Sequence, residues 1–327
     1  MLTKKSIKIA LIRQRYNPFG GAERFVERII KSSNKYKIQI TLITRKWPNT
    51  KDTKSNTILL CNPFYIGSLW RDWSFSRCIK RQLKKNKFNL IQSHERLCEC
   101  DIYRAGDGVH REWLNQRNRS TSLWQKLLIS INPYHVYIKN EEAKLFKNKL
   151  LKKIICNSNM VKDEIKFHYQ IPDSKITIIR NGLDFTKFHP SIKNQYRNEI
   201  RLQHNISNED TLFLFVGSGF SRKGLESALK ALSKLPKNTY LLIIGKDKKE
   251  KYFIKKSNEL DIRNRVIFLE GKQNVIPYYS AADVFILPTI YDPFPNATLE
   301  AMACGLPVIT SYKSGTSEII THGKMVI

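Results

Sequence analysis

The sequence lacks any run of eighteen consecutive apolar residues, so it predicts no transmembrane helix. It also lacks the pattern of a signal peptide. The apolar run of residues 7–12 is short, is interrupted by Lys8 and is not followed by a small-residue cleavage site. This run predicts a first β-strand instead, and we expect the protein to stay in the cytoplasm.

Cysteine pairs with metal-ligand spacing are missing too. No Cys-x-x-Cys occurs, and Cys98-Glu-Cys100 is not a spacing typical of zinc sites. We therefore expect most of the cysteines to be reduced thiols in the core or at the surface. The six cysteines are Cys61, Cys78, Cys98, Cys100, Cys156 and Cys304.

Acidic side chains are scarce, since 28 Asp and Glu stand against 57 Lys and Arg, a formal net charge of +29. Residues 1–150 carry 31 of the basic and 11 of the acidic residues, a net charge of +20, so the excess lies in the first half. A basic surface can bind nucleic acid, an anionic membrane or a phosphorylated substrate. The alternative is a lysine-rich composition with no single partner.

What the sequence does contain is an alternation of short strand-like runs and amphipathic helices, which predicts α/β layers with parallel sheets. The runs are rich in Val, Ile, Leu and Phe without strict alternation, as suits strands buried on both faces. A first series comprises residues 7–12, 38–44, 57–60, 88–91, 153–156 and 176–179. A second series comprises residues 212–216, 240–244, 266–268, 284–287 and 307–310.

Two domains are expected, because the polar and weakly periodic segment of residues 184–210 separates the two series. We place the boundary so that the domains are residues 1–187 and 188–327. Helices with one apolar stripe are predicted at residues 21–31 and 223–235.

A less regular segment, residues 113–149, contains apolar side chains spaced for one helix face among Lys and Arg. Two interpretations are open: a helix packed on the core, or a helix lying at a membrane interface. We favour the packed helix, because an ordinary core-facing helix shows the same stripe. The side chains concerned are Trp124, Leu127, Leu128 and Ile131.

The first candidate site follows the first strand, where Pro18-Phe19-Gly20-Gly21 leads into a helix. Paired glycines let the backbone approach a ligand, and a helix N-terminus offers N–H groups to a phosphate. The motif is not Gly-x-Gly-x-x-Gly, so an ordinary turn explains it equally well.

The second candidate site follows strand 212–216, where Gly217 begins a glycine-rich turn that ends in Arg222-Lys223-Gly224. Arg binds phosphate as a fork and Lys binds it as a point charge, and fixed cations stabilise the charge of a departing diphosphate. The alternative is a solvated Arg-Lys pair. Positive charge at a helix start opposes the helix dipole, which favours a functional role.

The third candidate site follows strand 284–287, where a Pro-rich loop holds Asp292 and leads into a helix. Asn296 is the predicted N-cap of a helix over residues 297–304, which Gly305 ends.

Glu300 then falls in the first turn of this helix, so two carboxylates flank its start. Carboxylates accept hydrogen bonds from adjacent hydroxyl pairs, as in a ribose or a hexose. The backbone N–H groups of Ala297, Thr298 and Leu299 can meet phosphate. The alternative for Glu300 is an ordinary first-turn acid that favours the helix dipole.

Taken in order, these motifs resemble the GT-B glycosyltransferases of family 4 (group 1). The resemblance is carried by Pro18–Gly21, by Gly217 with Arg222-Lys223-Gly224, and by the acid-x7-acid motif Asp292 to Glu300. The stretch of residues 181–190 is similar to the inter-domain sequence of the family. The resemblance covers essentially the whole chain and is strongest to enzymes that add glucose to the core of lipopolysaccharide.

The resemblance implies two Rossmann-like domains that face each other across a cleft, the first on the acceptor side and the second binding the nucleotide-sugar. It implies that Gly20 and Gly21 face the donor and that Arg222 and Lys223 hold the diphosphate as it leaves. Glu300 would bind the ribose hydroxyls, and Asp292 would bind hydroxyls of the transferred sugar. Gly217, Asn296, Ala297, Thr298 and Leu299 complete the expected donor site.

On the acceptor side the resemblance implies a role for Asp107, which follows a strand-like run at a position where many family members carry His. His94 and Glu95 end another strand and are further acceptor-side candidates. For each of these residues, an ordinary polar loop residue is an equally good interpretation.

The implied reaction is a retaining transfer of a hexose, expected to be glucose from a UDP-sugar, to a lipopolysaccharide-core or related glycolipid. No Asp-x-Asp motif occurs, so no metal or other cofactor is expected, because cations take the place of Mg²⁺. The basic first half would dock at the inner face of an anionic cytoplasmic membrane and hold a phosphorylated glycolipid. We expect no nucleic-acid partner, because no aromatic residues interleave on a basic strand face.

Two departures from the family pattern are visible. Asp292 stands where Glu is commoner, which shortens the side chain by one methylene. The sequence stops at Ile327, soon after residues 315–318, whereas family members continue into further helices that return to the first domain. Truncated C-terminal helices are therefore expected, and activity depends on this point.

Three rival functions stay open at this stage. One is a GT-B nucleotide-sugar epimerase or hydrolase, which turns over donor without acceptor. The second is a polyanion-binding protein without catalysis, whose binding would be sensitive to salt. The third is a truncated, inactive protein that still binds a nucleotide-sugar.

Overall fold

The computed structural model describes residues 7–16, 21–33, 36, 38–47, 56–119 and 121–323. The chain divides into two compact units, Met1–Ile179 and Arg180–Ile327, which we call the first and second units and describe separately. The division lies ahead of the boundary between residues 187 and 188 that we place from the sequence. The difference arises because Leu183, which the sequence-based boundary leaves in the first domain, packs against the core of the second unit.

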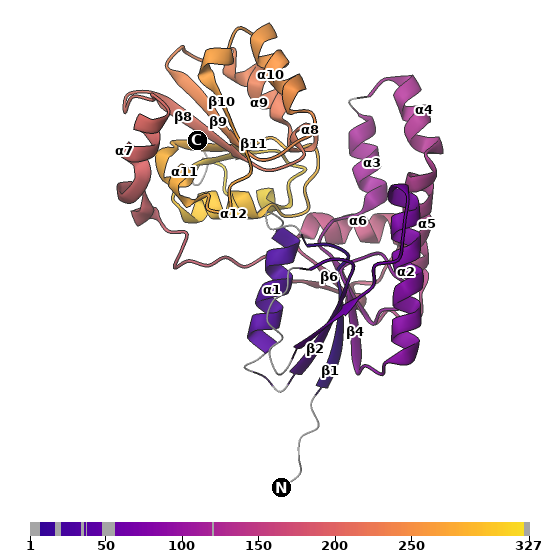
Figure 1. The fold of residues 1–327 in the computed structure, drawn as a ribbon. Coiled ribbons are helices and arrows are strands. Elements are labelled where there is room, and N and C mark those ends of the chain that lie inside the picture. The colour runs from indigo at the N-terminus through magenta and orange to yellow at the C-terminus, as the bar shows by residue number, and fades with distance from the viewer. Residues whose placement is uncertain are drawn as a thin grey trace. The chain divides into compact units, whose positions relative to one another are not determined.

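The first unit contains a seven-stranded sheet of order β3-β2-β1-β4-β5-β6-β7 in which every pair is parallel (Figure 1). The order reverses at β1, which lies between β2 and β4. In sheets of this kind, ligands bind at the carboxyl ends of the strands where the order reverses. The strands are β1 (Ile7–Ile12), β2 (Ile38–Thr44), β3 (Asn56–Leu60), β4 (Leu90–Ser93), β5 (Ile102–Ala105), β6 (Lys153–Cys156) and β7 (Ile176–Ile178).

Helices cover both faces of this sheet, because successive side chains of a buried strand point to opposite faces. Val26 of α1 packs with Leu11 on one face, whereas Phe75 of α2 packs with Ile12 on the other. Figure 1 shows α1 and α2 on opposite sides of β1 and β2. The helices are α1 (Gly21–Ser33), α2 (Gly67–Lys85), α3 (His110–Asn118), α4 (Leu123–Ile131), α5 (Pro133–Lys147) and α6 (Asn159–Tyr169), with a 3₁₀ turn η1 (Asp173–Lys175).

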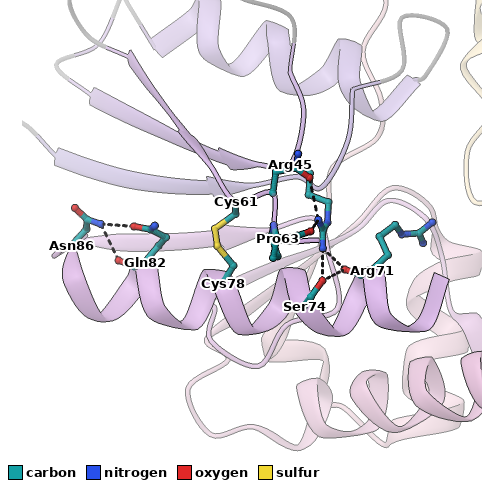
Figure 2. Close-up of a disulfide and its surroundings, with 9 residues drawn as sticks. Arg45, Cys61, Pro63, Arg71, Ser74, Cys78, Gln82 and Asn86 are labelled. Atoms are coloured by element: carbon teal, nitrogen blue, oxygen red, sulfur yellow. Dashed lines mark hydrogen bonds between the residues drawn. A yellow bond between two sulfur atoms is a disulfide. The ribbon is translucent and has the colours of Figure 1, made fainter. Parts of the chain in front are cut away.

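A disulfide joins Cys61, directly after β3, to Cys78 in the middle of α2, with the two Cα atoms 5.9 Å apart (Figure 2). The other four cysteines are free thiols, of which three are buried. The sequence predicts reduced thiols for most of the cysteines and gives no sign of this pair. The pairing depends on how α2 packs against the end of β3, which local sequence does not report.

The second unit contains a five-stranded parallel sheet of order β10-β9-β8-β11-β12, which reverses at β8. Its strands are β8 (Thr211–Val216), β9 (Thr239–Ile244), β10 (Val266–Leu269), β11 (Val284–Leu287) and β12 (Val308–Thr310). Its helices are α7 (Lys193–Gln203), α8 (Phe220–Lys223), α9 (Leu225–Leu232), α10 (Glu250–Glu259), α11 (Ile276–Ala281) and α12 (Asn296–Ala303). The 3₁₀ turns are η2 (Pro190–Ile192), η3 (Arg263–Arg265) and η4 (Gly315–Ile319). Both units are thus α/β layers, as the sequence predicts.

The predicted helix over residues 223–235 is wrong at its start. The structure has two helices there, α8 and α9, which are separated by Gly224 with φ +78°. A Cβ atom at this position would lie 1.9 Å from the carbonyl oxygen of Pro288, so only glycine lets the chain turn here. This close approach brings Lys223 toward the loop that follows β11.

The interpretation of residues 113–149 as a packed helix is also wrong for α4. Its apolar side chains are largely exposed, and Ile129 is the buried residue of the helix. The exposed side chains are Leu123, Trp124, Leu127, Leu128 and Ile131, with exposed fractions from 52% to 80%. Among the described residues, no helix is long and apolar enough to cross a membrane.

We expect Gly224→Ala to destabilise the second unit strongly, because the new methyl group meets the Pro288 carbonyl in a left-handed backbone conformation. Gly219→Ala is the matched control. Gly219 has nearly the same φ, +79°, but its nearest neighbour would be 4.0 Å away. Thermal unfolding should show a loss of about 5 °C or more for Gly224→Ala and about 2–4 °C for Gly219→Ala. Equal losses would contradict the steric argument.

Candidate active site

Three charged side chains meet in the second unit at the carboxyl ends of β8 and β11. Arg222 donates from Nη1 to Asp292 Oδ2 at 2.9 Å, and the Lys223 ammonium donates to the same carboxylate oxygen. Lys223 and Asp292 are buried, with 8% and 6% of their surface exposed. We call these three residues the charge cluster, and it holds two cations against one carboxylate.

The backbone holds both ends of the charge cluster in place. The Asp292 N–H donates to Lys313 O at 2.9 Å, and Gly315 N–H donates to Asp292 O at 2.8 Å. On the other side, Arg222 O accepts from Ile290 N–H at 2.8 Å. The loop after β11 is therefore tied both to α8 and to the turn after β12, which fixes the carboxylate between the cations.

The electrostatics of the charge cluster follow from burial and from the paired charges. Burial disfavours the charged carboxylate, but the Lys223 ammonium and the Arg222 guanidinium outweigh it and lower the pKa of Asp292. Burial also lowers the pKa of Lys223, against the opposing effect of Asp292.

Glycines shape the turn between β8 and α8. A Cβ atom on Gly217 would lie 3.3 Å from Lys223 Cε, so Gly217 leaves room for the lysine side chain. The first N–H of α8, on Phe220, donates to Asp247 Oδ2 at 2.6 Å. The start of this helix is thus bonded to a carboxylate of its own unit.

Asn296 does not have the predicted N-cap role. The helix begins at Asn296 itself, with Pro295 at the N-cap position, and it ends at Ala303. The Asn296 side chain bonds to another segment, since its Oδ1 accepts from Asn181 Nδ2 at 2.8 Å. Asn181 Nδ2 also donates to Phe294 O at 3.1 Å, which ties the segment after β7 to the start of α12.

Glu300 lies in the second turn of α12, rather than in the first turn where we predict it. It is buried, and its Oε2 accepts from the Tyr279 hydroxyl at 3.1 Å. The same hydroxyl lies 3.2 Å from Ala297 O. Tyr279 therefore fixes the carboxylate, and the sequence shows no sign of this residue.

The remaining donor-site candidates of α12 differ in burial. Thr298 is fully buried, and its hydroxyl has no hydrogen-bond partner among the residues that the structure describes. Ala297 and Leu299 are partly buried. Of the first candidate site, Gly20 lies outside the described residues, and Gly21 begins α1.

A second polar cluster lies in the first unit, at the carboxyl ends of β1, β4 and β5. Arg13, directly after β1, donates to Asp107 Oδ2 at 3.0 Å and lies 3.5 Å from Glu95 Oε1. Glu95 also accepts from Gln14 N–H at 2.9 Å. The structure thus brings together two of the predicted acceptor-side residues, and Arg13 joins them.

Sequence reasoning missed Arg13, although one signal was present. It is the first residue after a buried strand, at the edge where parallel strands bring polar groups together. Packing disfavours the charged form of Asp107, but Arg13 outweighs this effect and lowers the pKa of Asp107 to about 2. Burial raises the pKa of Glu95, partly offset by Arg13.

His94 is buried beside this cluster. Its N–H donates to Ile12 O at 3.0 Å, its ring Nε2 lies 3.2 Å from Gln92 Nε2, and Phe25 packs on the ring. Burial, together with the charges of Arg104 and Arg13, holds the pKa of His94 well below its usual value. His94 is therefore neutral at physiological pH.

Each unit thus presents charged side chains at the carboxyl edge of a parallel sheet, at the strand where the order reverses. Two such units in one chain are the architecture of the GT-B fold, and the family matches place the chain in the class of glycosyltransferases. The chain belongs to the family 4 glycosyltransferases. Residues 19–187 match the family described as Glycosyltransferase Family 4, and residues 196–327 match the family described as Glycosyl transferases group 1.

Individual relatives agree with this assignment. The lipopolysaccharide glucosyltransferase WaaG of Escherichia coli strain K12 is 26% identical over 317 residues, which are 95% of this chain and 82% of WaaG. A crystal structure of WaaG superposes with a TM-score of 0.82 at 23% identity, covering 95% of this chain and 83% of that one.

Two further proteins are similar to the chain. Anabaena HepE, solved in complex with UDP and glucose, has a TM-score of 0.67 at 19% identity and covers 97% of this chain and 84% of its own. The Escherichia coli UDP-Gal:alpha-D-GlcNAc-diphosphoundecaprenol alpha-1,3-galactosyltransferase is 26% identical over 188 residues, 54% of this chain and 47% of that enzyme.

We expect Asp292→Asn to lower the stability of the second unit at pH 7. The free energy of unfolding should also change less with pH in the acid range. The folded-state pKa of Asp292 lies below its unfolded value, so the ion pairs stabilise the fold above about pH 4. This contribution is lost as the pH falls through the folded-state pKa. Asparagine cannot neutralise the buried Lys223, which costs about 3 kcal/mol at neutral pH.

Urea unfolding between pH 3 and pH 7 measures both effects. Glu226→Gln is the control, because it removes a carboxylate of an exposed pair with Lys230 in the same unit. At each pH, its free energy of unfolding should stay within about 0.5 kcal/mol of the wild-type value. An Asp292→Asn variant with the wild-type pH profile would exclude the assigned pairing.

Proposed function

We propose that the protein transfers a hexosyl group, glucose in the first instance, from a UDP-sugar to a lipopolysaccharide-core or related glycolipid, with retention at the anomeric carbon. The observation that carries the proposal is the charge cluster. Two fixed cations at the carboxyl edge of β8 suit a diphosphate leaving group. WaaG is named as a lipopolysaccharide glucosyltransferase, and HepE has been solved with UDP and glucose, which supports this donor and this acceptor class.

In this proposal, Arg222 and Lys223 stabilise the departing diphosphate. Negative charge develops on the leaving group during transfer, and fixed cations in a site with little water stabilise it strongly. Arg222, with 37% of its side chain exposed, would meet phosphate directly with its fork of N–H donors. Lys223, which is buried, would act on the phosphate through its charge rather than by direct contact.

The two carboxylates of the second unit take the hydroxyl groups of the donor in this proposal. Asp292 holds both cations and keeps acceptor capacity on its second oxygen for hydroxyls of the transferred sugar. Glu300, oriented by Tyr279, accepts from the ribose hydroxyls. The start of α12, with Asn296, Ala297, Thr298 and Leu299, completes the donor site, together with Gly217, Gly20 and Gly21.

The acceptor would bind at the polar cluster of the first unit, which lies in the acceptor-side domain, residues 1–187, that we place from the sequence. Asp107 is ionised and is held by Arg13, so its carboxylate can orient an attacking hydroxyl. His94 is neutral and buried, which favours a role in packing the site over one in binding phosphate. In retaining transfer the hydroxyl attacks the face that the diphosphate leaves, so the departing phosphate takes up the proton.

We expect Arg222→Ala to lower kcat about 10²- to 10³-fold, because it removes a fixed donor at the charge that develops in the transition state. The Arg222→Ala/Lys223→Ala variant should lose transfer entirely. Its folding is checked by circular dichroism. Formation of glycosylated acceptor from UDP-glucose measures the activity, with GDP- and ADP-glucose as alternative donors.

The control for this experiment is Lys230→Ala, which removes an exposed ammonium of the same unit that pairs with Glu226. It should keep wild-type activity. Full transfer by the folded double variant would exclude the proposed donor site. Donor hydrolysis without any acceptor requirement would point to a hydrolase instead.

The exposed apolar side chains of α4 support docking of the protein at an anionic membrane. The helix presents five large apolar side chains to solvent, with Trp124 79% exposed, and Lys126 lies among them. Trp and Leu beside Lys are the side chains that bury into the headgroup region of an anionic bilayer. We propose that α4 docks the protein on the inner face of the cytoplasmic membrane, near its glycolipid acceptor.

We expect Trp124→Ala/Leu127→Ala to weaken binding to vesicles of phosphatidylglycerol and phosphatidylcholine about tenfold or more, since two buried apolar anchors are lost. Co-sedimentation at low and moderate salt measures the binding. Leu202→Ala, which removes a side chain that is 80% exposed on α7 in the second unit, is the control and should bind like the wild type. Unchanged binding of the double variant would exclude α4 as the docking helix.

A further inference from the structure

Three consecutive residues after β1 connect the acceptor-side cluster to a neighbouring surface of the first unit. Arg13 holds Asp107 and lies near Glu95, as described above. The side chain of Gln14 donates from Nε2 to Asp72 Oδ1 on α2 at 3.0 Å. Arg15 donates from Nη2 to the Tyr65 hydroxyl at 2.8 Å, in the connection between β3 and α2. Three consecutive residues thus make polar contacts with Asp107, Asp72 and Tyr65 in turn.

Beyond Tyr65 the surface is aromatic. Phe64, Tyr65 and Trp70 are 74%, 36% and 44% exposed, and the rings of Phe64 and Trp70 meet edge to face with centroids 5.9 Å apart. We call Phe64, Tyr65 and Trp70 the aromatic platform. Large exposed aromatic side chains that contact each other beside a polar site mark a binding surface.

Guanidinium groups fix the position of the platform and add positive charge to it. Arg45, which is buried, lies 4.8 Å from the centre of the Tyr65 ring and donates to Pro63 O at 2.8 Å. Figure 2 shows the same side chain reaching Arg71 O and Ser74 Oγ on α2. Arg15 is exposed, and Arg71 pairs with Asp72 at 2.6 Å. Three cations thus surround the platform, against the carboxylate of Asp72.

The aromatic platform and its surrounding cations favour a phosphorylated saccharide over a lipid surface as the ligand. A sugar ring has an apolar C–H face that packs on aromatic rings, and hydroxyls at its rim that need fixed hydrogen-bonding groups. A bilayer needs apolar area and positive charge but no such fixed groups. Here Gln14 and Arg45, which are buried and bonded to named partners, hold the platform in place, and exposed Arg15 fixes the Tyr65 hydroxyl at its rim. Exposed Arg15 adds a donor suited to phosphate.

We propose that the aromatic platform with Arg15 is a second acceptor subsite, which binds a phosphorylated sugar adjacent to the one that reacts at Asp107. The inference rests on the proposed function, because it assumes that the acceptor binds at the Asp107 cluster. It adds that the acceptor is an oligosaccharide phosphate, recognised over more than one sugar. Trp70 and Phe64 contact the ring, and Arg15 contacts the phosphate.

The test uses the full-length protein and a water-soluble probe, the deacylated core oligosaccharide of lipopolysaccharide, with and without its phosphate groups. Binding is measured by calorimetry, independently of turnover, and transfer from UDP-glucose gives KM and kcat. Trp70→Ala should raise Kd and KM for the phosphorylated probe about tenfold and leave kcat within twofold. Arg15→Gln should weaken binding of the phosphorylated probe and leave the dephosphorylated probe unchanged.

Phe167→Ala on α6 is the matched control, because it removes another aromatic side chain of the same unit that is 81% exposed, and it should leave both probes unaffected. If the wild type transfers glucose but Trp70→Ala binds the probe normally, the subsite is excluded and the proposed function stands. A Trp70→Ala variant that loses binding to anionic vesicles alone would show a membrane contact and overturn the proposal. If the wild type does not bind the oligosaccharide phosphate at all, the subsite is also excluded, whereas transfer to another acceptor still supports the wider function.

Discussion

Every strand pair in the two sheets of the described chain is parallel, and this constraint decides where the chemistry can be. Parallel strands end at the same edge, so the residues that follow β1, β4 and β5 must meet, as must those that follow β8 and β11. Arg13, Glu95 and Asp107 meet in this way in one unit, and Arg222 and Asp292 meet in the other. Residues far apart in sequence thus form compact charged clusters without any need for a long ordered loop.

The two clusters arrange their charges differently. In the second unit, two cations share one carboxylate, which leaves the net positive charge that the proposed diphosphate site requires. In the first unit, Arg13 lies between two carboxylates, and the charges of Arg96 and Arg104 act on Asp107 as well. Each cluster thus keeps an acidic side chain against cations at a strand end, within a strongly basic chain.

Much of this arrangement could be predicted from the sequence. Several strands have the predicted bounds, because β-branched runs buried on both faces have few alternative structures. They are residues 7–12, 38–44, 153–156 and 284–287. Arg222, Lys223 and Asp292 could be selected as charged residues in turns after such strands. The exposure of α4 could not be predicted, because an apolar stripe looks the same whether it packs on a core or lies on a surface. The partners of Arg13, Asn296 and Cys78 depend on packing between distant segments, which local patterns do not carry.

The bond between Cys61 and Cys78 closes a loop that contains Phe64, Tyr65 and Trp70. A covalent cross-link at both ends of a loop limits the conformations that the loop can adopt before a ligand arrives. In the proposed subsite, less conformational freedom would then be lost when the aromatic rings contact a sugar. The cross-link would thus act on recognition through the order of the unbound loop, without contributing a contact of its own.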